Sequence, residues 1–204
     1  NIIYDFIIVL KGLTMSHKIL VTGHTSGIGE IIYNGFENIR GVSRSEGYDI
    51  SNTEQANSIV SLAKEYDIFI NNAFNVKDIN NLTNPETMFS QTELLYKVYD
   101  VYKDSDTPKL IINLGSNTTH GIKSHIWPYS AAKQSLEKGS EQLCYHNSNC
   151  FVSLLTFGYV ATERVKNTAG DSPMLPIECV NTSINYIIDS FSQAIKVKEI
   201  CLLP

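Results

Sequence analysis

The sequence lacks any apolar run long enough to cross a bilayer as a helix, which takes about 20 residues. Residues 2–10 are largely apolar, but this stretch is too short for a span and has neither the basic start nor the small-residue cleavage site of a secretion signal. No membrane association is therefore predicted. We expect Met15 to be the natural start, with residues 1–14 as an N-terminal extension and residues 15–204 as a single domain.

Charged residues are also scarce. They make up 18% of the 204 residues and leave a formal net charge of −5, so no basic surface for nucleic acid is indicated. The four cysteines (Cys144, Cys150, Cys179 and Cys201) include no C-x-x-C pair, which argues against a zinc site, and no other metal site is predicted. We expect unpaired thiols in a reducing cytoplasm. Because 43% of the residues are apolar, the chain can fill a sizeable core.

Short apolar runs alternate with segments of helical periodicity, a pattern typical of an α/β domain with a parallel sheet. The run Leu110–Leu114 is continuously apolar, as expected for a strand covered on both faces. The sequence predicts a doubly wound, Rossmann-type parallel sheet of about six strands with helices on both faces, and a loop over Glu163–Leu175. The predicted strands are 18–22, 40–43, 67–71, 110–114, 151–156 and 199–203, and the predicted helices are 27–38, 53–65, 86–103, 128–146 and 176–192.

A glycine-rich turn, Thr22–Gly29, follows the first predicted strand and opens the first predicted helix. Glycines allow a sharp turn and let a phosphate approach main-chain N–H groups, and a helix N-terminus offers unpaired donors to a pyrophosphate. The spacing is G-x-x-x-G-x-G, which in this context favours a dinucleotide site; a glycine turn that binds nothing is the alternative. The candidate phosphate-binding residues are Gly23, Thr25, Ser26, Gly27, Ile28 and Gly29.

The second predicted strand ends at Ser43 and Arg44, where an NAD site would place Asp or Glu to hold the ribose 2′-hydroxyl. Arg offers a planar fork of donors that suits a 2′-phosphate. These two residues therefore favour NADP(H) over NAD(H), with an ordinary exposed Arg44 as the alternative.

Tyr129 and Lys133, four residues apart, share one face of a predicted helix. A nearby ammonium stabilises a phenolate, so we expect Lys133 to lower the pKa of Tyr129 and tune it as a general acid/base. Ser116 ends a central strand, where ligands of open α/β sheets bind, and its hydroxyl can hold a substrate oxygen. A Tyr-x-x-x-Lys pair alone is a weak signal, and it gains weight from the order and spacing of the other motifs.

Together these motifs resemble the short-chain dehydrogenase/reductase family over most of residues 17–203. The family's T-G-x-x-x-G-I-G turn matches residues 22–29, and its Y-S-A-A-K motif matches residues 129–133 letter for letter. Its N-N-A-G and P-G-x-V-x-T motifs resemble residues 71–74 and 157–162. The resemblance implies a Rossmann-fold oxidoreductase that transfers a hydride between NADP(H), or else NAD(H), and a small carbonyl or alcohol substrate.

The resemblance also implies roles for the matching residues. Tyr129 would be the general acid/base, Lys133 would hold the nicotinamide ribose, and Ser116 would orient the carbonyl. Further cofactor contacts are implied for Asp49, Ile50, Asn72, Ala73, Gly158, Val160 and Thr162. Family members usually form homodimers or homotetramers, which sets the expectation for assembly.

The sequence departs from the family pattern at three points. Asp49 follows Arg44 by only five residues, too few for a parallel crossover, so we expect a sheet that lacks one edge strand and its helix. No Asn stands near Thr87–Gln91, where the family often has a proton-relay Asn, so another group or a water would have to serve. Phe74 and Phe157 replace a usual Gly and Pro near the cofactor, where they either narrow the pocket or repack it.

Several aromatic and imidazole side chains leave alternatives open. His24 is expected to face solvent, with a phosphate contact as the alternative. His120 and His125 flank the substrate site, although a catalytic histidine is the less favoured interpretation. Trp127 and Tyr159 are candidates for pocket walls.

Two hypotheses about function follow. The short segment after Thr162 favours a small substrate, and the intact Ser116, Tyr129 and Lys133 favour an enzyme. The alternative is a non-catalytic NAD(P)-binding sensor or regulatory protein on the same fold, because a fold alone never fixes a function.

Overall fold

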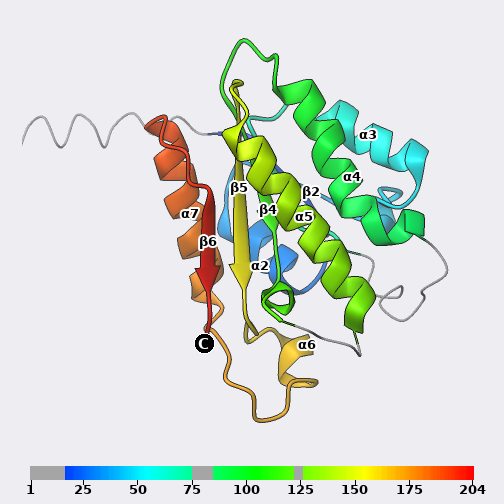
Figure 1. Cartoon of the computed structure of the whole chain (residues 1–204), viewed down its shortest axis with the longest axis vertical. Coiled ribbons are helices and arrows are strands. Elements are labelled where there is room, and N and C mark those ends of the chain that lie inside the picture. Colours follow the sequence, from blue (N-terminus) through cyan, green and yellow to red (C-terminus); the bar gives the residue numbers. More distant parts are fainter. Residues whose placement is uncertain (1–16, 75–84, 122–125) are drawn as a thin grey trace, which may run out of the picture.

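The computed structural model describes residues 17–74, 85–121 and 126–204, with the side chains of residues 85–87 left aside. Six parallel strands form one sheet in the order β2-β1-β3-β4-β5-β6 (Figure 1). The strands are β1 (Ile19–Thr22), β2 (Ile39–Val42), β3 (Ile68–Asn71), β4 (Lys109–Leu114), β5 (Cys150–Phe157) and β6 (Glu199–Leu202). The predicted fold class is confirmed, and each predicted strand lies within two residues of an observed one.

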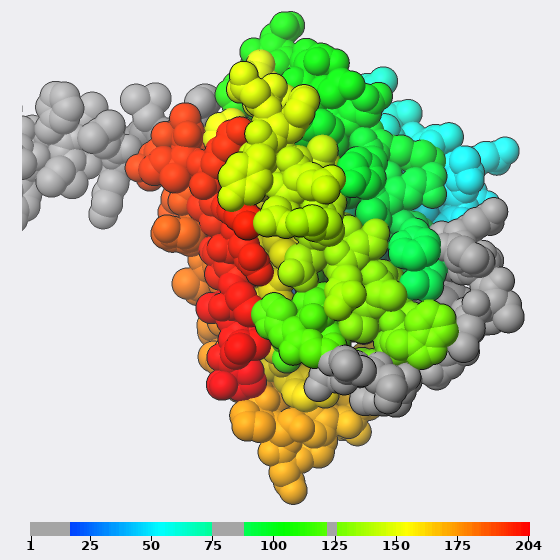
Figure 2. Space-filling view, in the orientation of Figure 1, coloured from blue at the N-terminus to red at the C-terminus, as the bar shows by residue number. Residues whose placement is uncertain are grey.

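Helices cover both faces of the sheet. They are α2 (Gly27–Gly35), α3 (Thr53–Ala63), α4 (Pro85–Tyr102), α5 (Trp127–Tyr145), α6 (Glu163–Lys166) and α7 (Glu178–Ser192). Alternate side chains of each strand enter opposite cores. Val21 and Ile70 pack in the core with Ile184 of α7, whereas Leu20 and Phe69 pack in the core of the α3–α5 face. Figure 2 shows α5 at the front of that layer, with α4 and α3 beside it.

The connection from β2 to β3 explains why the sheet has six strands. After β2 the chain makes one 3-10 turn, Arg44–Glu46, and then enters α3, which leads to β3 on the other side of β1. No strand lies outside β2 in the described sheet, so the predicted loss of an edge strand and its helix is confirmed. The direction of winding reverses between β1 and β3, and the crevice at the carboxyl ends of these two strands is where open α/β sheets bind ligands.

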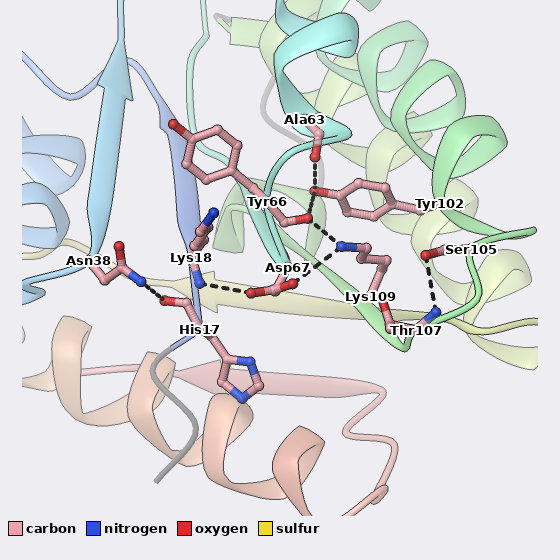
Figure 3. A network of polar contacts seen from close by, with 10 residues as sticks. All are labelled: His17, Lys18, Asn38, Ala63, Tyr66, Asp67, Tyr102, Ser105, Thr107 and Lys109. Carbon is pink, nitrogen blue, oxygen red and sulfur yellow. Dashed lines mark hydrogen bonds and ion pairs between the residues drawn. The ribbon is translucent and has the colours of Figure 1, made fainter.

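A polar network ties the amino ends of the strands together, at the opposite end from that crevice (Figure 3). Asp67 accepts from the backbone N–H of Lys18 at 3.0 Å and from Nζ of Lys109 at 3.2 Å. Lys109 also donates to the carbonyl of Tyr66 at 2.9 Å, and the Tyr102 hydroxyl donates to the carbonyl of Ala63 at 2.9 Å. These bonds fix the starts of β1, β3 and β4 relative to one another, and with them the register of the sheet.

The segment predicted as a loop, Glu163–Leu175, begins with the one-turn helix α6. Thr162 caps this turn by accepting from the backbone N–H of Val165 at 3.4 Å. The segment then returns to the sheet, where Leu175 pairs with Val160. The predicted extension, residues 1–14, and His125 lie outside the described residues. None of the described helices combines the length and the apolar character that a membrane span needs.

Candidate active site

The glycine turn is built by backbone geometry that side chains would disturb. Gly27 has a φ of 61°, a conformation that favours glycine. A Cβ on Gly29 would lie 2.0 Å from the carbonyl oxygen of Gly23, so only glycine allows α2 to start this close to β1. Ser26 stands before the helix without a side-chain cap, and Thr25 and Ser26 are exposed. The first-turn N–H groups of α2 are thus left to meet a phosphate.

Asn72 holds this turn against the end of β3. Its side-chain amide donates to the carbonyls of Thr22 at 2.9 Å and Gly23 at 3.2 Å. In return, the Thr22 hydroxyl accepts from the backbone N–H groups of Asn72 and Ala73 at 3.1 and 2.9 Å. The crevice between β1 and β3 therefore has rigid walls, and Asn72 and Ala73 line it beside the glycine turn.

The end of β2 carries a carboxylate that the sequence pattern did not reveal. Glu46 folds back through the 3-10 turn, and its carboxylate accepts from the hydroxyl of the buried Ser43 at 2.9 Å. The same carboxylate lies 3.8 Å from Nδ1 of His24. Arg44 is exposed on the same turn. Both a cation and an anion thus stand at the place where a Rossmann-type site receives the adenosine ribose.

The expectation that His24 faces solvent is wrong. Its side chain is 13% exposed and packs over Gly41, where a Cβ would lie 2.1 Å from the imidazole. Its ring also contacts Tyr33, with centroids 4.8 Å apart. Because Gly41 has no side chain, there is room for this imidazole. A contact between residues this far apart in the sequence cannot be predicted from a local pattern.

Asp49 and Ile50 mainly serve the local structure. The Asp49 carboxylate accepts from the backbone N–H and the hydroxyl of Ser51, at 2.9 and 2.6 Å, in the turn that leads to α3. Ile50 is buried in the core on the α3 face. The packing gives Ile50 a core position and leaves Asp49 half-buried in the turn before α3.

Ser116 and Tyr129 meet at the carboxyl end of β4. Ser116 is buried and caps the 3-10 turn Asn117–Thr119, and its hydroxyl is close enough to the Tyr129 phenol to affect the pKa of that group. Burial raises the pKa of Tyr129, whereas the nearby Ser116 hydroxyl and the charge of Arg164 act to lower it. The expected lowering by Lys133 is therefore wrong for this structure, because desolvation of the phenolate outweighs the favourable contacts.

Lys133 is deeply buried on α5, at 3% exposure. Its ammonium donates to the side-chain carbonyl of Gln91 at 2.8 Å and to the backbone carbonyl of Leu114 at 2.7 Å. Its Nζ lies 5.7 Å from the centroid of the Tyr129 ring, so the two motif residues share a site as the spacing predicted. Burial lowers the pKa of Lys133 to about 7, since the charged form loses its water.

Phe74 closes this site from the side of β3. Its ring meets the Tyr129 ring edge-on at 4.9 Å, and Nζ of Lys133 lies 5.3 Å from its centroid. Of the two alternatives stated for Phe74, the contacts favour a narrowed pocket. For Phe157 the structure favours the other alternative, repacking, because its side chain is buried in the core on the α7 face.

The last of the predicted cofactor residues lie in the segment after β5. Gly158 is half-buried beside Asn117, Val160 is buried in the core, and Thr162 is occupied as the cap of α6. Trp127 and Tyr159, the proposed pocket walls, are each 49% exposed. His120 is exposed as well.

A buried amide network lies behind Lys133, and sequence reasoning missed it. Gln91 donates to the backbone carbonyl of Asn71 at 2.8 Å, and the Asn71 amide donates to the backbone carbonyl of Gln91 at 3.0 Å. The Asn71 amide also donates to Asn113 at 2.9 Å, and Asn113 donates to Ser140 at 3.0 Å. The only local signal was the presence of polar residues inside otherwise apolar strands.

Neither a protein-family model nor a curated protein sequence matches this chain. Solved structures do match it. A short-chain type dehydrogenase/reductase from Mycobacterium marinum is 15% identical, with a TM-score of 0.75 over 95% of this chain and 97% of that chain. RhlG of Pseudomonas aeruginosa, in an active-site complex with NADP, is 14% identical, with a TM-score of 0.72 over 92% and 95% of the two chains.

A third match is 3-ketoacyl-(acyl-carrier-protein) reductase from Brucella melitensis in complex with NADH. It is 18% identical, with a TM-score of 0.69 over 91% of this chain and 96% of that chain. These identities are low, yet the matches extend over nearly the whole of each chain. The chain therefore has the fold of the short-chain dehydrogenases and reductases, as its motifs predicted.

Proposed function

We propose that this chain is an oxidoreductase of the short-chain dehydrogenase/reductase type, which uses NADP(H) to interconvert a small carbonyl compound and its alcohol. The observation that carries the proposal is the cluster of Ser116, Tyr129 and Lys133 at the carboxyl end of β4. This cluster lies on the same edge of the sheet as the glycine turn after β1. A hydride carrier bound at the crevice would thus extend toward an acid/base pair.

The residues present fit a dinucleotide at its phosphate end. The first turn of α2 offers backbone N–H groups, and the turn carries no side chain at Gly27, around which the space is open. At the nicotinamide end, Lys133 and Tyr129 are covered by Phe74. A ribose can reach Lys133 only if the Phe74 ring moves aside.

Each residue of the cluster has a separate task in the proposed reaction. The nicotinamide, when bound, supplies or accepts the hydride. The Ser116 hydroxyl donates to the substrate oxygen and orients the carbonyl. Tyr129 gives its proton to that oxygen during reduction and takes it back during oxidation. Lys133 offers donors to the nicotinamide ribose.

The preference for NADP(H) rests on Arg44, whose guanidinium can pair with a 2′-phosphate. Glu46 opposes it, since a carboxylate bonded to Ser43 accepts readily from a ribose 2′-hydroxyl and repels a phosphate. The glycine turn, Asp49, Ile50, Asn72 and Ala73 are proposed for the adenosine and phosphate side. Gly158, Val160 and Thr162 are proposed for the nicotinamide side.

The alternative, a non-catalytic NAD(P)-binding sensor, is favoured by one observation: Phe74 covers the acid/base pair. Tyr129→Phe separates the two functions. For an enzyme, we expect loss of turnover by at least about a hundredfold with cofactor binding kept, because general acid/base catalysis contributes that much or more. A sensor would show no turnover of any carbonyl in the wild type and unchanged binding in the variant.

The first experiment is a titration of the purified protein with NADPH and, separately, with NADH, followed by nicotinamide fluorescence. Tighter NADPH binding supports the preference assigned to Arg44. Equal binding removes that preference and leaves the oxidoreductase proposal intact. Binding of neither cofactor overturns both the enzyme and the sensor.

Three further proposals concern surroundings and assembly. The four cysteines are unpaired, which fits a reducing compartment such as the cytoplasm. The partner is a small molecule, with neither nucleic acid nor a membrane involved. A homodimer or homotetramer is proposed from the family resemblance, and sedimentation equilibrium of the full chain tests it.

A further inference from the structure

Lys133 is a buried cation whose described neighbours carry no opposite charge. Its two hydrogen-bond acceptors are neutral carbonyls, one from Gln91 and one from Leu114. The rings of Phe74 and Tyr129 also lie near it, with centroids 5.3 and 5.7 Å from Nζ. An ammonium in such a place depends on dipoles that point their negative ends toward it, because water does not reach it.

The two carbonyls differ in what fixes them. The Leu114 carbonyl belongs to the backbone of β4. The Gln91 carbonyl is on a side chain of α4, and it faces Lys133 because the other end of the same amide donates to the backbone carbonyl of Asn71 at 2.8 Å. Gln91 is 2% exposed, so this orientation has no competition from solvent. Rotation of the amide by half a turn would place its NH₂ group against the ammonium and its oxygen against a carbonyl.

The side-chain amide of Asn71 also holds Gln91 in place. It donates both to the backbone carbonyl of Gln91, at 3.0 Å, and to the side-chain oxygen of Asn113, at 2.9 Å. The ends of β3 and β4 are thereby joined to α4 through a connected set of amides. In this set the side-chain oxygen of Asn71 is buried with no hydrogen-bond partner among the described residues. The bonds that are made favour a single geometry, since each broken one would leave a further buried polar group unpaired.

We propose that Gln91 is a positioning residue that keeps the ammonium of Lys133 charged and directed at the side of the pocket where Tyr129 lies. Its significance for turnover rests on the proposed function. The contact joins residues 42 positions apart, from two helices, and depends on how α4 packs against α5. Without this acceptor, burial would favour the neutral amine of Lys133 still more strongly.

The test is the ionisation of Lys133 itself, measured in the full chain without cofactor or substrate. Lysine labelled with ¹³C at Cε is followed by NMR as a function of pH, with the Lys133 signal assigned from Lys133→Met. Two near-isosteric variants are compared with the wild type. Gln91→Met removes the acceptor, and Gln91→Glu replaces it with a charge. Gln142→Met, at an exposed position on α5, is the matched control.

Opposite shifts are expected from the two variants. Gln91→Met should lower the pKa of Lys133 by about one unit, since a hydrogen bond to a charged group is worth about that much. Gln91→Glu should raise the pKa of Lys133, because an opposite charge stabilises the ammonium. Gln142→Met should leave it unchanged. A residue that merely fills space would not move the titration in opposite directions.

The proposal is overturned if Lys133 titrates alike in the wild type and in both folded variants. If Gln91→Met does not fold, Gln91→Glu decides alone, since it keeps the size of the side chain and an oxygen beside Lys133. Failure of both to fold assigns Gln91 to stability only and also overturns the proposal. No cofactor takes part in the titration. A failed oxidoreductase assay would therefore not affect its interpretation, and a failed titration would not decide whether the chain is an oxidoreductase.

Discussion

The ring of Phe74 meets the ring of Tyr129 edge-on, with centroids 4.9 Å apart. The same Phe74 ring lies 5.3 Å from Nζ of Lys133. One aromatic side chain therefore covers both members of the acid/base pair, at a position where the family resemblance leads one to expect glycine. A nicotinamide ribose bound at Lys133, as proposed, would compete with the ring for the same space, and this competition would have a measurable cost.

Phe74→Ala should tighten NADPH binding by about fivefold. Displacing the ring from Tyr129 sacrifices an aromatic contact worth about 1 kcal/mol, and the variant has no such contact to lose. Nicotinamide fluorescence titration measures the change. Phe89→Ala, at an exposed site on α4, is the control and should bind as the wild type does. Weaker binding in Phe74→Ala would mean that the ring supports the bound cofactor.

The choice of cofactor should depend on two charges at the end of β2. Glu46→Gln should improve the affinity for NADPH relative to NADH by about tenfold, since one carboxylate no longer repels the 2′-phosphate across a few ångströms of solvent-exposed surface. Arg44→Ala should change the ratio in the opposite direction. Parallel titrations with both cofactors measure it.

Glu54→Gln, on the exposed side of α3, controls for the loss of an acidic residue as such. If Glu46→Gln and Glu54→Gln have equal effects, Glu46 acts only through net charge. If neither Glu46→Gln nor Arg44→Ala alters the ratio, the end of β2 does not determine the preference.

The sheet and the glycine turn were predictable because their signals are local. A strand buried on both faces must be a continuous apolar run, and Leu110–Leu114 is one. The expected turn needs glycine at Gly27 for its positive φ and at Gly29 for its closeness to Gly23. These requirements act over a few residues, so the sequence alone carries them.

The misjudged features depend on contacts between distant segments. His24 is covered because Gly41, on the neighbouring strand, leaves space for an imidazole. Glu46 reaches Ser43 only through the shape of the 3-10 turn. Gln91 meets Lys133 through the packing of α4 on α5. The direction of the Tyr129 pKa was wrong for a related reason: spacing indicates the neighbour but not the degree of burial.

Arg164→Gln should raise the pKa of Tyr129. Burial already raises that pKa, and the charge of Arg164 on α6 is one of two influences that lower it. Ultraviolet difference titration of the phenolate, with Tyr129→Phe subtracted, measures the change. Lys166→Gln, on the same short helix, is the control and should leave the titration unaltered.

In an assay of alcohol oxidation, which needs the phenolate, the rise in rate should move to higher pH in Arg164→Gln. The proposed influence is absent if the two variants titrate alike.

Asp67→Asn should destabilise the fold at neutral pH by about 1 kcal/mol or less, because the carboxylate is partly exposed and screened by water. Burial raises the pKa of Asp67, but the bonds from Lys18 and Lys109 outweigh it and leave the pKa below its usual value.

A carboxyl whose pKa is depressed on folding stabilises the fold above its unfolded pKa of about 3.9, and this contribution is lost as the pH falls through the folded value. Urea unfolding should therefore separate wild type and variant at pH 7, and the difference should become smaller as the pH falls toward 3. Asp100→Asn, which removes an exposed ion pair on α4, should produce a smaller difference at pH 7. A gap between wild type and Asp67→Asn that persists unchanged at pH 3 would show that the carboxylate's charge is not what ties β1 to β3 and β4.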